Sequence, residues 1–184
     1  MPFYWPSLEG QRHVGRSCGT YAMDAYLDIE TTGLSPYYDR ITVIGVGLPK
    51  GRSLRVTQLY DNTLTKGHLA DLLEGVSKLY TYNGGRFDLP FIHQRLGLDI
   101  TAKVDHYDLM YDCWQGGLYG GLKAVEARLG IARESAGMTG RDAVLLWRRY
   151  QDSGDEQALE ILLAYNREDV SNLEILRRKL GRNA

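Results

Sequence analysis

Short apolar segments bounded by turn residues dominate the first 110 residues, which is the pattern of β-strands. Residues 40–48 are rich in β-branched side chains, and residues 54–59 alternate between apolar and polar side chains. Gly51 between these two segments indicates a tight hairpin. The strands that this pattern predicts are residues 25–29, 40–48, 54–59, 79–82 and 104–107.

Apolar residues at helical spacing follow from residue 65 onward. Leu69, Leu72, Leu73 and Val76, for example, fall on one helix face. The helices that this spacing predicts are residues 65–76, 86–96, 121–129, 139–150 and 155–180. Three consecutive strands, then alternating helices and strands, favour an α/β domain with a mixed five-stranded sheet, antiparallel first and parallel afterwards, flanked by helices. We expect residues 1–184 to form one such domain, with residues 1–20 as an irregular N-terminal lead-in.

Composition excludes several classes of protein. The chain has 184 residues, 43% hydrophobic and 24% charged, which is typical of a globular domain. The two cysteines are too few and too unpatterned for a disulfide scaffold or a zinc site. No apolar run approaches the roughly 20 residues that span a bilayer, and no signal peptide is apparent, so we expect a cytoplasmic protein without a membrane partner. The net charge of −1 neither indicates nor excludes a nucleic-acid partner.

The first acidic cluster is Asp28-Ile29-Glu30, at the end of a predicted strand. Because side chains alternate along a strand, Asp28 and Glu30 lie on the same face. Two carboxylates there repel each other, and a hard divalent cation would relieve that repulsion. A pair of solvated acids on an edge strand explains the pattern equally well.

The second cluster, Asn83 to Asp88, follows a buried strand and a Gly-Gly turn and leads into a helix. Ligand sites gather at the carboxyl ends of strands in α/β sheets. The alternative is that Asp88 caps the helix, since acids are favoured in first turns.

The third cluster lies on the last predicted helix. Asp169 falls on the same stripe as Leu162, Leu173 and Leu176, which should face the core, and Tyr165 is one turn earlier on that stripe. A buried carboxylate without a partner is costly, so this position points to a cation or another strong partner. For Tyr165 alone, a core aromatic with its hydroxyl at the edge is the competing interpretation.

Taken in order, the three clusters resemble the three exonuclease motifs of the DEDD superfamily over about residues 24–180. The stretch from Tyr26 to Leu34 resembles the first motif. The stretch from Tyr82 to Phe91 is similar to the second motif of family B polymerase proofreading domains and of stand-alone predicted ribonuclease H-like exonucleases. The stretch from Tyr165 to Val170 resembles the third motif in its tyrosine form, because the histidine form needs His at position 164, which is Ala. The pattern is therefore that of the DEDDy-type 3′–5′ exonucleases within the DnaQ-like, ribonuclease H-like superfamily.

This resemblance implies a ribonuclease H-like fold and a two-metal exonuclease that uses Mg²⁺ or Mn²⁺ on DNA or RNA, with a single-stranded 3′ end as its partner. The implied metal ligands are Asp28, Glu30, Asp88 and Asp169. Tyr165 would orient the attacking water, since its ordinary pKa near 10 makes it a poor base. The implied nucleotide-binding residues are Thr31, Leu34, Asn83 and Phe87, although core packing also explains Phe87.

Other residues have open interpretations. The basic residues that could bind backbone phosphates, or form solvated helix faces, are Lys123, Arg128, Arg133, Arg141, Arg148 and Arg149. Asp108 is expected to cap the helix after its strand. The alternative function is a nucleic-acid-binding module on the same fold with little catalytic activity.

Overall fold

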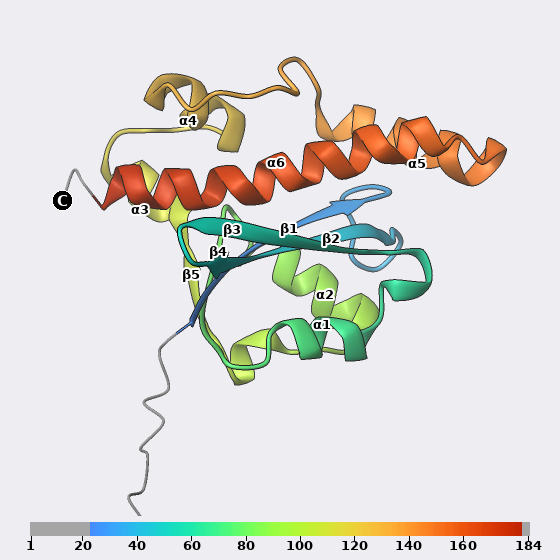
Figure 1. The fold of residues 1–184 in the computed structure, drawn as a ribbon, viewed down its shortest axis with the longest axis horizontal. Helices are drawn as coiled ribbons and strands as arrows, with labels where there is room; N and C mark the ends of the chain where they lie inside the picture. Colours follow the sequence, from blue (N-terminus) through green and yellow to red (C-terminus); the bar gives the residue numbers. More distant parts are fainter. Residues whose placement is uncertain (1–22, 182–184) are drawn as a thin grey trace, which may run out of the picture.

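The computed structural model describes residues 23–181, which form a mixed five-stranded sheet with helices on both faces (Figure 1). The strands are β1 (Met23–Thr31), β2 (Ile41–Lys50), β3 (Ser53–Tyr60), β4 (Val76–Thr81) and β5 (Asp105–Asp108). Their spatial order is β3-β2-β1-β4-β5; β1, β2 and β3 pair antiparallel, and β4 and β5 join in parallel. The predicted sheet is confirmed. The predicted lead-in, residues 1–20 with Cys18, lies outside the described residues.

Helices cover the sheet unequally. One face carries α1 (Lys66–Leu72) and α2 (Asp88–Leu96), and the long α6 (Glu156–Leu180) crosses the other (Figure 1). The remaining helices pack beside α6: α3 (Leu109–Gln115), α4 (Leu122–Leu129) and α5 (Gly140–Ser153). Two short 3₁₀ turns, Asp61–Thr63 and Ile100–Ala102, complete the connections.

Strand β1 lies at the centre of the sheet and is covered on both faces. Leu27 and Ile29 belong to the apolar core beneath α1 and α2, whereas Tyr26 belongs to the core on the α6 side. Because strand side chains alternate, Asp28 and Glu30 point toward α6. The edge-strand alternative for these two acids is therefore wrong.

Two glycines on β2 allow α6 to approach the sheet closely. A Cβ at Gly45 would lie 2.3 Å from Asn166 Oδ1, and a Cβ at Gly47 would lie 2.8 Å from Val170 Cγ1. Gly45 is also the cross-strand neighbour of Asp28. Because Gly45 has no side chain, α6 can pack directly over Asp28.

One predicted helix is too long. Residues 65–76 have helical spacing, but α1 ends at Leu72, and Val76 is the first residue of β4. Gly75, with φ of 77°, makes the turn between them. Val76 is apolar because it packs in the core of the sheet. Its position four residues after Leu72 matches helical spacing by coincidence.

The structure bears on two features that the composition raised, the cysteines and the possibility of a membrane-spanning helix. Cys113 is a buried free thiol on α3. Among residues 23–181, none of the helices has the length and apolar character needed to cross a membrane.

Candidate functional site

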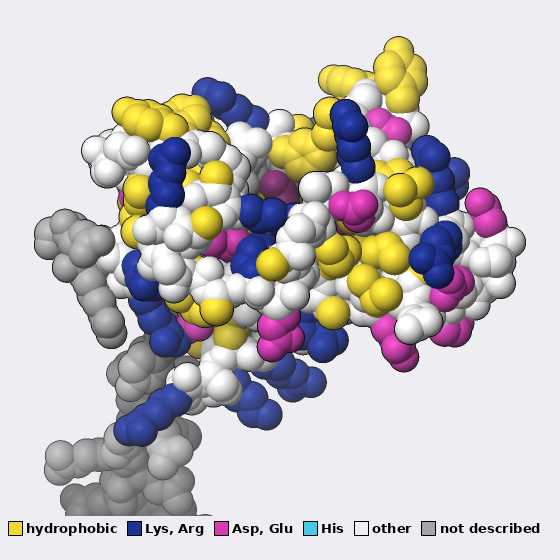
Figure 2. Space-filling view, turned by 90° about the horizontal axis from the view of Figure 1, so that it is seen from above, with side chains coloured by type: hydrophobic (Ala, Val, Ile, Leu, Met, Phe, Trp, Pro, Cys, Tyr) yellow, Lys and Arg dark blue, Asp and Glu magenta, His cyan; other side chains and the backbone are white. Residues whose placement is uncertain are grey.

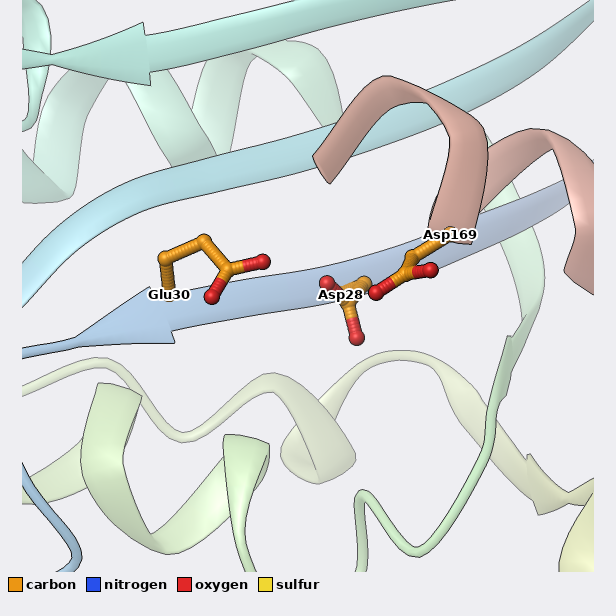
Figure 3. Close-up of side chains that lie close together, drawn as sticks. All are labelled: Asp28, Glu30 and Asp169. Carbon is orange, nitrogen blue, oxygen red and sulfur yellow. The ribbon is translucent and has the colours of Figure 1, made fainter. Parts of the chain in front are cut away.

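Three carboxylates from two distant parts of the chain meet on the α6 side of the sheet. Asp28 and Glu30 come from β1 and Asp169 from the middle of α6 (Figure 3). One oxygen of each lies within 4.8 Å of the others. Glu30 and Asp169 are each only 7% exposed. The sequence prediction that Asp169 faces inward is explained by its helix stripe, since Leu162, Leu173 and Leu176 are buried on the same side.

Burial and mutual repulsion make these acids hard to ionise. Loss of hydration raises the pKa of Asp28 and of Glu30 well above the ordinary range, and the charge of Asp169 raises both further. The pKa of Asp169 is raised to about 6 by burial, against the opposing effect of Arg133. A cation among the three oxygens would offset both causes, because its charge stabilises the ionised carboxylates.

Asp88 approaches the same end of β1 from α2. Its Oδ1 accepts a hydrogen bond from the Ile29 N–H at 3.1 Å, and burial raises its pKa to about 7. Asp88 is the first residue of α2, but Phe87 holds the cap position and no side-chain cap bond forms. Asp88 thus lies in the first turn of α2, as the capping alternative expects, but it is not the N-cap residue, and its carboxylate joins α2 to β1. Asp88 lies outside the group of three close carboxylates.

A single cleft of about 770 Å³ is lined by every residue that the sequence predicted for the catalytic and nucleotide-binding site. These residues are Asp28, Glu30, Thr31, Leu34, Asn83, Phe87, Asp88, Tyr165 and Asp169. They come from β1 and its following loop, the turn before α2, and α6. The start of α5 also lines the cleft, through Thr139, Gly140, Arg141 and Val144, so four separate sequence segments assemble it.

A family model described as the RNase H superfamily matches residues 25–181, which include the sheet from the third residue of β1 onward, helices α1 to α6 and the cleft. This chain belongs to the RNase H superfamily.

An uncharacterised protein of the archaeon Methanocaldococcus jannaschii is 30% identical over 157 residues, covering 79% of this chain and 88% of the relative. Among solved structures, Brucella melitensis NrnC superposes with a TM-score of 0.61 at 21% identity, covering 89% of this chain and 74% of that one. NrnC with bound Mg²⁺ superposes with a TM-score of 0.60. These likenesses support the same fold for this RNase H superfamily member.

The donor set of this superfamily member suits a hard divalent cation. Asp28, Glu30 and Asp169 offer oxygen atoms only, from buried acids whose neighbours disfavour their ionisation. Mg²⁺ and Mn²⁺ prefer carboxylate oxygens, whereas zinc favours nitrogen and sulfur. The residues present therefore fit the class of metal that the sequence predicted.

Two basic side chains lie at the acidic cleft. Arg133 forms an ion pair with Asp169 and another, at 2.7 Å, with the fully buried Glu126. The Lys123 ammonium lies 4.3 Å from the centre of the Tyr165 ring. Figure 2, which looks onto the side of α4, α5 and α6, shows basic and acidic side chains next to each other at the middle of this surface.

Both residues were candidates for phosphate binding, with a solvated helix face as the alternative. That alternative is wrong for Arg133, because its side chain is 8% exposed and ion-paired. Arg149 pairs with Asp155 at the surface, and Arg141 lines the cleft.

Asn166 is a site residue without a prediction from the sequence. Its Nδ2 donates to Asp28 Oδ2 at 3.0 Å and to the Asp28 carbonyl at 3.2 Å, and its Oδ1 accepts from Gln58. The side chain is fully buried opposite Gly45. Its place next to Tyr165 in the third motif was the only indication in the sequence that it belongs to the site. Its contact with Asp28 depends on how α6 crosses the sheet.

The turn before α2 is held in an uncommon conformation. Asn83 has φ of 63°, in the left-handed region that asparagine tolerates better than most residues. Asp108 accepts from the Asn83 N–H at 2.7 Å and also caps α3 by accepting from the Met110 N–H. The capping role expected for Asp108 is confirmed, and the same carboxyl group also fixes the turn at the cleft.

The apolar candidates differ in exposure. Phe87 packs against Phe91, with ring centroids 4.9 Å apart, and also lines the cleft, so it belongs to both core and site. Leu34 is 85% exposed at the cleft rim. The Thr31 hydroxyl donates to the Gly33 carbonyl at 2.5 Å, which tightens the loop that carries Leu34.

Proposed function

We propose that this protein is a metal-dependent 3′–5′ exonuclease of the DEDDy type, which removes nucleotides from the 3′ end of single-stranded DNA or RNA. The observation that carries this proposal is the cleft in which four acids and Tyr165 lie together with four candidate nucleotide contacts. An acidic cleft alone would repel a polyanion. Divalent cations on the acids would reverse that repulsion and draw a phosphate in.

The acids would hold two Mg²⁺ or Mn²⁺ ions. Asp28, Glu30 and Asp169 would bind one ion, and Asp28 with Asp88 would bind the other. When bound, such ions polarise the attacking water and neutralise the charge of the phosphate. Structures of NrnC with Mg²⁺ and with pGG support divalent metals and nucleotides as ligands of this fold.

The protein's own residues would orient the reactants. Tyr165 would donate a hydrogen bond to the attacking water or the phosphate. Burial, with the charges of Asp169, Glu30 and Asp28, raises the pKa of Tyr165 far above its usual value, so the hydroxyl keeps its proton. Asn83 would hydrogen-bond the terminal nucleotides, and Leu34 and Phe87 would pack against them.

The reaction is hydrolysis of the last phosphodiester. The oxygen of water forms a bond to phosphorus and the bond from phosphorus to the 3′ oxygen breaks. That oxygen takes a proton, and a nucleoside 5′-monophosphate leaves. The shortened strand then presents a new 3′ hydroxyl to the cleft.

End-labelled single-stranded DNA and RNA test this function directly. Incubation with Mn²⁺ should shorten 5′-labelled strands one nucleotide at a time, and chelator should stop the reaction. Strands labelled at the 3′ end should release labelled mononucleotide at once. Labelled strands that stay intact but shift on a native gel would instead support the nucleic-acid-binding module.

A further inference from the structure

Two aromatic side chains lie together on α3, next to the catalytic cleft: Tyr111 is exposed and Trp114 is half-buried. Tyr111 is 43% exposed and meets Trp114 edge to face, with ring centroids 5.6 Å apart and planes at 88°. The Arg86 guanidinium lies 5.8 Å from the centre of the Trp114 ring. We call Arg86, Tyr111 and Trp114 the α3 shelf. One exposed ring, one half-buried ring and an exposed cation together form a surface that a ligand can reach.

The α3 shelf continues the catalytic cleft through one short turn. Asn83 lines the cleft, and two residues further on Gly85 and Arg86 line a hollow of about 450 Å³ that Tyr111 also borders. Asp108 accepts the N–H groups of both Asn83 and Gly85, at 2.7 and 3.2 Å. The two hollows are therefore held in a fixed relation to each other.

The charge of Arg86 is available to a ligand. Within residues 23–181, no carboxylate lies at ion-pair distance from Arg86. The nearby Asp108 is used by backbone N–H groups, and both oxygens of Asp112 accept from the Tyr107 hydroxyl. Arginine beside aromatic rings is the combination that binds single strands, since the cation takes a phosphate and the rings stack on bases.

We infer that the α3 shelf binds the nucleotides that lie upstream, on the 5′ side, of the nucleotide being removed. Arg86 takes a backbone phosphate, and Tyr111 and Trp114 stack on the bases. This inference rests on the proposed function. It makes the preferred substrate a single strand of three or more nucleotides rather than a dinucleotide.

Length dependence tests the inference. The full chain with Mn²⁺ is assayed on oligothymidylates and oligouridylates of two to six nucleotides and on the p-nitrophenyl ester of thymidine 5′-monophosphate, which cannot reach the α3 shelf. For the native protein, kcat/KM should rise by roughly tenfold or more between two and four nucleotides. In Arg86→Ala and Trp114→Leu, most of that gain should disappear, while Trp114→Phe should restore it in part.

Arg95→Ala is the matched control, because Arg95 is an exposed arginine at the far end of α2. It should keep the full length dependence. A native protein without length dependence, or α3 shelf variants that retain it, would overturn the inference while leaving the exonuclease intact. Anisotropy of labelled hexamers separates the two ideas. If the native protein binds hexamers but cuts nothing, the proposed function fails, and loss of that binding in Arg86→Ala still supports the shelf.

Discussion

The two faces of the sheet have opposite characters although they share the same strands. The face beneath α1 and α2 is an apolar core that includes Leu27, Ile29, Phe91 and Ile92. The face beneath α6 carries the acids. Strand β1 divides the two, because Leu27 and Ile29 point one way and Asp28 and Glu30 the other.

This contrast shows where the fold obtains its stability and where it tolerates strain. The apolar face removes hydrocarbon from water and contains none of the site acids. The α6 face buries carboxylates whose pKa values are raised, and its Glu126–Arg133 pair is removed from water. Buried charges add little to stability, so the α6 face depends on its own apolar cluster, which includes Tyr26, Val170 and Leu173, and on the core of the opposite face.

The largest expected effect is a loss of activity that distinguishes two neighbouring residues of β1 on opposite faces of the sheet. Asp28→Asn should lower the proposed exonuclease activity by about 10³-fold or more, because the two proposed metal sites would lose the acid that they share. Its melting temperature in chelator should be unchanged or higher, since the remaining acids lose a repulsive neighbour and the amide oxygen can still accept the hydrogen bond from Asn166. Single-turnover rates and thermal unfolding measure the two quantities.

The matched variant for that comparison is Leu27→Ala, one residue away and fully buried on the other face. It should cost about 2–5 kcal/mol of unfolding free energy through the cavity it leaves. Activity per folded molecule should change far less than in Asp28→Asn. The contrast between the faces breaks down if Asp28→Asn retains full activity.

The next effect concerns the distance between α6 and the sheet. Gly45→Ala should push Asn166 and Val170 away, costing about 1–3 kcal/mol and lowering activity as Asp169 moves from Asp28. Gly67→Ala is the control, because Gly67 is exposed within α1 with room for a methyl group. The control should be neutral or slightly stabilising. Equal losses in both variants would show that the close packing of α6 is unimportant.

The sequence predicted the sheet and the acids for a physical reason. Alternation along β1 and the stripe on α6 are local patterns, so the faces of Asp28 and Asp169 follow from them. The contacts of Arg133, Glu126 and Asn166 depend on how α6 crosses the sheet. The spacing of apolar residues along the sequence does not predict that crossing. Boundaries failed for the same reason at Val76, where an apolar residue fits both a helix and the strand that begins there.

Tyr165→Phe should give a smaller effect, confined to turnover. Turnover should slow about tenfold, because a single hydrogen bond to water or phosphate is lost while the acids remain. Manganese affinity, measured by calorimetry, should stay within about twofold of the native value. An unaltered rate would remove the Tyr165 hydroxyl from the reaction and leave the ring as packing against Lys123.

The last effect is the pH dependence of stability, which should come from the α6 face and the neighbouring Asp88. Burial raises the pKa from 3.8 to about 6 for Asp169 and to about 7 for Asp88. An acid whose folded pKa is raised binds more protons folded than unfolded between the two values. The unfolding free energy in chelator should therefore fall as pH rises from about 4 to about 7.

Divalent metal should reverse that fall, because cations replace the protons. The gain in melting temperature on adding Mn²⁺ should be larger at pH 8 than at pH 5.5. Asp88→Asn combined with Asp169→Asn should flatten the pH slope and remove most of the metal effect, whereas Ile29→Val on the apolar face should keep both. A metal effect that is equal at the two pH values would mean that the cation binds away from these acids, and the α6 face would then lose its distinction as the metal-binding side of the sheet.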